Sequence, residues 1–216
     1  MKYLLTAATA LAAGLLGAGC FGGLKNENPV PIHYRISAPK LAPGTPLAAD
    51  VLLAVAATAP GLDGTGIAGR WPGSRIDYLA GARWPARTPA LIESALIEAL
   101  QDSGRLRSVQ GDFGRSRTTH SLTLEVRRFE ADYTGGEPPV ARVALAVTVG
   151  RQWDRGVLAA FVVAAEERAS ENRVRAVVAA LDAAFQRAAD ELAGKSFDAI
   201  ARDLAAARVP AAGNSP

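Results

Sequence analysis

Ser121–Tyr133 has the sequence Ser-Leu-Thr-Leu-Glu-Val-Arg-Arg-Phe-Glu-Ala-Asp-Tyr and decides the fold, because apolar and polar side chains alternate along it. Such alternation is typical of a strand with one face in the core. The apolar positions change parity at Arg127-Arg128, between Leu122 on one side and Phe129 on the other. One extra residue exchanges the two faces of a strand, and we therefore predict a β-bulge at these arginines.

The chain after this strand predicts an antiparallel meander. Gly135-Gly136 and Pro138-Pro139 are turn residues, and apolar side chains alternate from Val143 to Val149. Asp154-Arg155-Gly156 then favours a tight turn into a third strand over Val157–Glu167.

The chain before this strand predicts shorter strands and a glycine-rich loop. Strands are expected at Ile32–Ile36, ended near Pro39, and at Val51–Thr58, where a continuous apolar run suggests burial on both faces. Further short strands are expected at Arg75–Leu79 and Arg105–Val109, with a loop or hairpin rim over residues 61–73.

Two helices complete the predicted fold. Apolar residues recur at helical spacing from Leu91 to Leu100, with Pro85 in the first turn and Gly104 as the C-terminal cap. A second, longer stripe runs from Val174 to Leu204, with a break or kink at Gly194. These elements predict an α/β class: a three-layer domain with a largely antiparallel sheet, made of the meander and shorter N-terminal strands, packed by two main helices.

The N-terminus has the pattern of an export signal. Lys2 precedes an uncharged, mostly apolar stretch over residues 3–16, and Gly17-Ala18-Gly19 leads into Cys20, the only cysteine. This arrangement resembles the bacterial lipobox, although Gly17 stands where Leu is usual. We predict a signal peptide over residues 1–19 and lipid attachment at Cys20. The alternative is an ordinary signal peptide with an incidental cysteine near its cleavage site.

The rest of the chain divides into a lipidated tether at 20–31, a folded domain at 32–208 and a disordered tail at 209–216. Phe21 follows the cysteine instead of the Asp that retains lipoproteins at the inner membrane of enteric bacteria. By resemblance to that sorting rule, we expect the protein on the periplasmic face of the outer membrane, anchored by its lipid.

No residue pattern predicts catalysis, a cofactor or a metal site, so we expect a protein that is not an enzyme. His33 and His120 have no Cys, Asp or Glu at ligand spacing, and Gly61–Gly69 lacks the ending of a phosphate-binding loop. Glu166-Glu167 and Glu171 are interpreted as surface charges. Without residues 1–19, 23 basic and 21 acidic side chains remain. This small excess, without interleaved aromatic residues, argues against nucleic-acid binding.

Three segments resemble the ABC-type transport auxiliary lipoproteins, a PqiC-like family. They are Ile76–Trp84 (IDYLAGARW), Pro89–Leu106 (PALIESALIEALQDSGRL) and Val177–Phe185 (VVAALDAAF), and the resemblance extends over nearly all of residues 20–205. Tyr78 and Trp84 match the first segment and are interpreted as packing residues.

The resemblance implies a three-layer α/β domain on the inner leaflet of the outer membrane. It also implies ABC permeases and MCE-domain proteins as partners in moving phospholipid or other hydrophobic molecules, and a homo-oligomeric ring in some members. From another functional class, a structural or assembly envelope lipoprotein such as a secretin pilotin remains the alternative.

Overall fold

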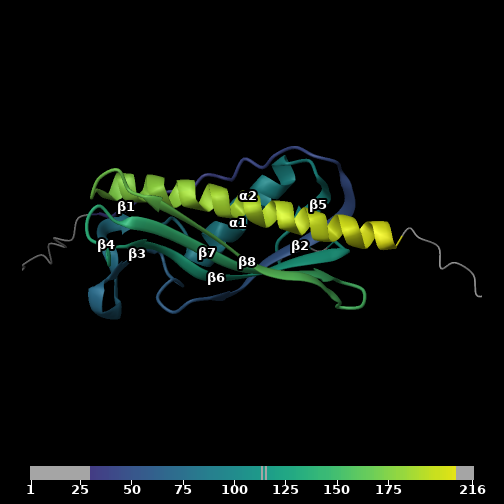
Figure 1. Cartoon of the computed structure of the whole chain (residues 1–216), viewed down its shortest axis with the longest axis horizontal. Helices are drawn as coiled ribbons and strands as arrows, with labels where there is room; N and C mark the ends of the chain where they lie inside the picture. The colour runs from purple at the N-terminus through teal and green to yellow at the C-terminus, as the bar shows by residue number, and fades with distance from the viewer. Residues whose placement is uncertain (1–29, 113, 115, 208–216) are drawn as a thin grey trace, which may run out of the picture. The chain divides into compact units, whose positions relative to one another are not determined.

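The computed structural model describes residues 30–112, 114 and 116–207, which form one sheet and two long helices (Figure 1). The predicted signal peptide, Cys20, most of the predicted tether and the tail lie outside the described residues. In chain order the elements are β1 (Ile32–His33), β2 (Leu47–Thr58), β3 (Gly66–Trp71), the short 3-10 helix η1 (Pro72–Ser74), β4 (Arg75–Arg83), α1 (Thr88–Asp102), β5 (Leu106–Gln110), β6 (His120–Asp132), β7 (Val140–Arg151), β8 (Val157–Arg168) and α2 (Val174–Ala206).

The predicted meander is confirmed, since β6 pairs antiparallel with β7 and β7 pairs antiparallel with β8. The predicted bulge is confirmed as well. Val126 pairs with Leu145 and Arg128 with the adjacent Ala144, which leaves Arg127 as the extra residue. The bulge keeps the apolar side chains on one face, so that Leu122 and Phe129 are both buried despite their opposite parity.

Strand β6 lies at the centre of the sheet. Its second edge is shared by two strands that run parallel to it: β2 pairs from His120 to Val126, and β3 pairs from Glu130 to Asp132. Beyond these, β5 pairs with β2, and β4 pairs with β3 and with the two-residue strand β1. Strand β1 is therefore an edge strand, in the part of the sheet where β3 pairs with the C-terminal residues of β6.

Both helices contribute to one core on one face of the sheet. Phe129 of β6 meets Trp84 before α1 at a ring distance of 5.7 Å and Phe185 of α2 at 6.1 Å. The segment between β1 and β2 runs beside α2, where the Ser37 and Lys40 backbone N–H groups donate to Asp182 and Gln186. The α/β class, the largely antiparallel sheet and the two main helices are confirmed. One detail differs, because the described residues form two layers where three were expected.

The glycine-rich stretch differs from the prediction, because Gly66–Trp71 forms β3 instead of a loop. Pairing with β4 and β6 outweighs the weak strand propensity of glycine. A side chain at Gly66 would collide with the ring of Tyr78, and one at Gly69 with the ring of Trp71. These glycines therefore allow close approach of aromatic rings within the sheet.

Other boundaries also need correction. The first strand ends at His33, and β4 extends to Arg83. Strand β2 buries one face, since Val51 and Leu53 are buried whereas Leu52 is only half-buried. Helix α1 begins at Thr88 with Pro89, not Pro85, in its first turn. Helix α2 runs through Gly194 without the predicted break.

Candidate functional site

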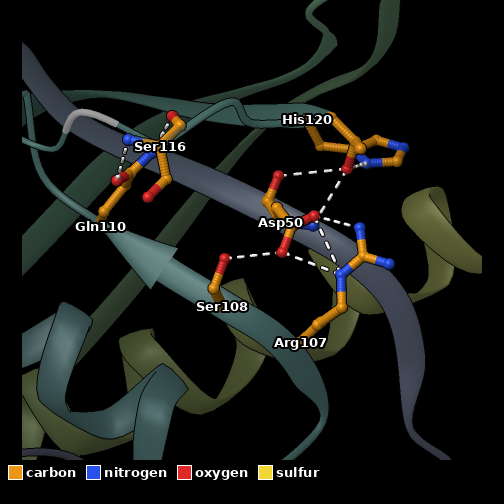
Figure 2. A network of polar contacts seen from close by, with 7 residues as sticks. Asp50, Arg107, Ser108, Gln110, Ser116 and His120 are labelled. Atoms are coloured by element: carbon orange, nitrogen blue, oxygen red, sulfur yellow. Dashed lines mark hydrogen bonds and ion pairs between the residues drawn. The ribbon is translucent and has the colours of Figure 1, made fainter.

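A network of polar contacts fixes the end of the sheet at which β6 begins. The Asp50 carboxylate on β2 accepts from Arg107 on β5, whose Nε lies 3.0 Å from each carboxylate oxygen (Figure 2). Arg107 Nη2 also donates to this carboxylate, and Ser108 Oγ donates to it at 2.7 Å. These hydrogen bonds, the one from Arg107 above all, hold the pKa of Asp50 below its usual value although partial burial opposes the shift.

Thr119 connects Asp50 to the start of β6. Its backbone N–H donates to Asp50 O at 2.8 Å, while Asp50 N donates to Thr119 Oγ1 at 3.0 Å. Thr119 Oγ1 also lies 2.8 Å from His120 Nδ1 (Figure 2). On its other side, Thr119 O accepts from Gln152 N at 2.9 Å. One residue thus joins β2, β6 and the hairpin between β7 and β8.

His120 extends the network to the helical layer. Its side chain is buried, and Nε2 lies 3.2 Å from Asp203 Oδ2 on α2. Asp203 Oδ1 in turn lies 3.2 Å from Arg151 Nη1, and Arg151 Nη2 lies 3.1 Å from Asp154 Oδ2. The His120–Asp203 pair has no local sequence signal, because the two residues are 83 positions apart.

The β7–β8 hairpin presents an exposed aromatic ring. Trp153 is 77% exposed, and the Arg151 guanidinium lies 5.1 Å from the centre of its ring. The turn is closed by Arg151 N, which donates to Gly156 O at 2.8 Å, and Arg155 adopts a φ of 57°. A shallow surface pocket adjoins the ring and is lined by Ser116, Arg117, Thr118, Thr119, Gln152 and Trp153.

The charged and polar groups of this network are paired with one another. Both ring nitrogens of His120 have partners, and the Asp50, Asp154 and Asp203 carboxylates are each paired with a guanidinium. Side chains paired in this way hold the strands and the helix that carry them in fixed positions. Across residues 30–112, 114 and 116–207, no group of three or more His, Cys, Asp or Glu side chains is placed to hold a metal ion. In the same ranges, no helix is long and apolar enough to cross a membrane.

The face of the sheet away from the helices is a second candidate surface. Small side chains such as Ala57, Ala146 and Ala160 line a shallow groove there, with Glu125 and Arg127 at its border. Such a face offers contact area without a distinctive chemical group.

Towards the far end of β6, this face becomes charged. Glu130 and Asp132 are buried, and Arg142 Nε lies 2.8 Å from Asp132 Oδ2. Burial raises the pKa of the Glu130 carboxyl. Burial alone would also raise the pKa of Asp132, but hydrogen bonds from Thr134 hold that pKa below its usual value.

The other residues singled out in the sequence are dispersed. Trp84 packs in the core as expected, whereas Tyr78 is 47% exposed and its hydroxyl donates to Gly61 O at 2.9 Å. Glu166 pairs with Arg142, and Glu167 pairs with Arg187. His33 is exposed on β1. These residues form no common site.

The comparison with protein families identifies the domain. Residues 34–193 match the model of the ABC-type transport auxiliary lipoprotein component family, which covers most of the folded domain. The chain belongs to this family. Its members are described as lipoproteins and as auxiliary components of ABC-type transport, and the predicted family resemblance is confirmed.

Solved structures agree with this family assignment. Protein XCC0632 from Xanthomonas campestris, described as DUF330, is 25% identical, with a TM-score of 0.75 over 81% of this chain and 99% of its own. An uncharacterized protein is 15% identical, with a TM-score of 0.55 over 74% of this chain and 98% of its own, which shows the fold alone. No curated protein is significantly similar to this chain in sequence.

Proposed function

We propose that this chain is the auxiliary lipoprotein of an ABC/MCE-type system that moves phospholipid or other hydrophobic molecules across the periplasm. The match of residues 34–193 to the transport auxiliary family carries the proposal. The protein acts on the periplasmic face of the outer membrane, where a lipid at Cys20 holds it. Its role is docking and not chemistry.

The architecture fits such a role. The paired charges around Asp50 and His120 tie β2, β5, β6, the β7–β8 hairpin and α2 together, so the domain presents its surfaces in a fixed arrangement. A preorganised surface binds a partner with less loss of conformational entropy. The tether over residues 20–31 reaches at most about 40 Å when extended, which limits how far the domain operates from the membrane.

Co-purification of the full-length, tagged protein from solubilised envelopes tests the proposal. We expect MCE-domain and ABC permease proteins in the eluate, identified by mass spectrometry. The Cys20→Ala variant is the matched control, because it keeps the folded domain but loses the anchor. A secretin or peptidoglycan in place of the transport proteins would overturn the proposal in favour of an assembly lipoprotein.

A homo-oligomeric ring belongs to the same proposal, because the family resemblance implies it. The native mass of the detergent-solubilised protein tests this point. A mass of several subunits is expected, and a monomer at all protein concentrations would contradict a ring.

A further inference from the structure

The tip of the β7–β8 hairpin exposes two large apolar side chains that lie four residues apart in the sequence. Trp153 is 77% exposed and Val157 is 67% exposed, whereas the other two tryptophans, Trp71 and Trp84, are half-buried and buried. The indole ring combines a large apolar surface with a polar N–H group, and tryptophan is accordingly enriched at membrane–water interfaces.

Guanidinium groups surround this tip. Arg151 lies under the Trp153 ring, Arg155 is in the turn itself, and Arg117 lines the adjoining pocket. The carboxylates of Asp154 and Asp203 are already paired with Arg151. In the part of the chain that the structure describes, Arg117 and Arg155 have no carboxylate partner. The tip therefore offers cationic groups to an anionic surface.

The tip is also held in a fixed position. The Arg151–Gly156 backbone hydrogen bond closes the turn, and Gln152 N is bound to Thr119 O at 2.9 Å. Arg151 additionally reaches Asp203 on α2. The apolar side chains are thus exposed by a rigid hairpin, so that contact with a surface requires little further ordering.

We infer that this tip inserts into the anionic phospholipid surface of the membrane that anchors the chain. A stable protein interface buries about 800 Å² on each partner, which is far more than two side chains provide. An interfacial tryptophan with neighbouring cations, in contrast, is sufficient to add to the affinity of an existing lipid anchor. This inference rests on the anchoring at Cys20 in the proposed function.

The tip and strand β1, at which the chain enters the sheet, lie towards opposite ends of the sheet. Strand β1 pairs with β4, β4 pairs with β3, and β3 pairs with the C-terminal residues of β6. The first residue of β6, His120, instead pairs with Arg151 at the base of the hairpin that contains Trp153. The thirteen residues of β6 span about 40 Å. With the tether at one end of the sheet and the tip contact at the other, both ends of the folded domain are kept near the membrane.

Tryptophan quenching in proteoliposomes tests the inference. The acylated full chain is reconstituted into vesicles of phosphatidylethanolamine and phosphatidylglycerol, with or without brominated acyl chains. We expect bromine-dependent loss of tryptophan emission in the wild type and in the control variant Trp71→Phe. Trp71 stacks on Tyr133 near the other end of β6, with 4.8 Å between the ring centres. We expect this quenching to be lost in Trp153→Phe and weakened when phosphatidylglycerol is omitted.

Equal quenching in the wild type and in Trp153→Phe would overturn the inference. Efficient photo-crosslinking of position 153 to a protein, and not to lipid, would also overturn it. Flotation of the vesicles distinguishes this failure from failure of the proposed anchoring. If the anchor fails, the wild type and Trp153→Phe both remain unbound. If only the tip inference fails, both float with the vesicles but neither shows bromine-dependent quenching.

Discussion

Phe129 occupies the centre of the aromatic cluster, with ring distances of 5.7 Å to Trp84 and 6.1 Å to Phe185. Phe129→Ala removes this fully buried ring and leaves a cavity, so we expect the free energy of unfolding to fall by about 3–5 kcal/mol. Urea denaturation measures the change. Val162→Thr, at a site that is 46% exposed, is the control, and a similar loss there would contradict a localised core.

Asp50 makes the free energy of unfolding depend on pH. Its pKa is lowered in the folded state, above all by the hydrogen bond from Arg107, so its charged form stabilises the fold above the unfolded-state pKa. That contribution is lost as pH falls through the lowered, folded-state pKa. We expect Asp50→Asn to be less stable than the wild type at neutral pH, with the difference narrowing below about pH 4. Urea titrations across pH measure this, and a constant difference would refute the assignment.

Among the elements, α2 contains the clearest opportunity for stabilisation. Gly194 lies inside this 33-residue helix and is exposed. A Cβ atom at this position would meet no neighbouring atom within 4 Å. Gly194→Ala should therefore raise the free energy of unfolding by about 0.5–1 kcal/mol, because alanine loses less backbone entropy in a helix. Gly104→Ala should instead destabilise, because Gly104 has a φ of 63°. Thermal unfolding compares the two variants, and a lower Tm for Gly194→Ala would indicate a break in the helix.

The regular elements were predictable where a single period extends over many residues. In β6 and β7 the alternation placed both strands and the bulge at Arg127, and helical spacing placed α2. Strand β3 was missed because its glycines carry no strand signal, and its partners lie elsewhere in the sequence. Periodicity reports local burial, whereas such pairing depends on the assembled sheet.

The candidate site was less predictable than the fold. Asp50, His120 and Asp203 come from β2, β6 and α2, and no sequence spacing relates them. Trp153 did have a local signal, because it is a large aromatic residue directly before the turn sequence Asp154-Arg155-Gly156. An aromatic side chain at a tight turn has few ways to become buried.

The whole molecule combines a predicted lipid anchor with a domain whose described contacts favour docking. The transport family supplies the functional class, and the rigid network around Asp50 and His120 supplies the fixed surfaces. Because the anchor determines where those surfaces act, the central proposal depends on Cys20 more than on any residue of the folded domain.

Complementation of a strain that lacks the gene tests this dependence most directly. Cys20→Ala is compared with the wild type and with Phe21→Ala, which keeps the acylated cysteine, and the measured quantity is phospholipid transfer to the outer membrane. We expect Cys20→Ala to keep the wild-type Tm but to restore no transfer, whereas Phe21→Ala restores it. Full transfer by a soluble Cys20→Ala protein would contradict the account.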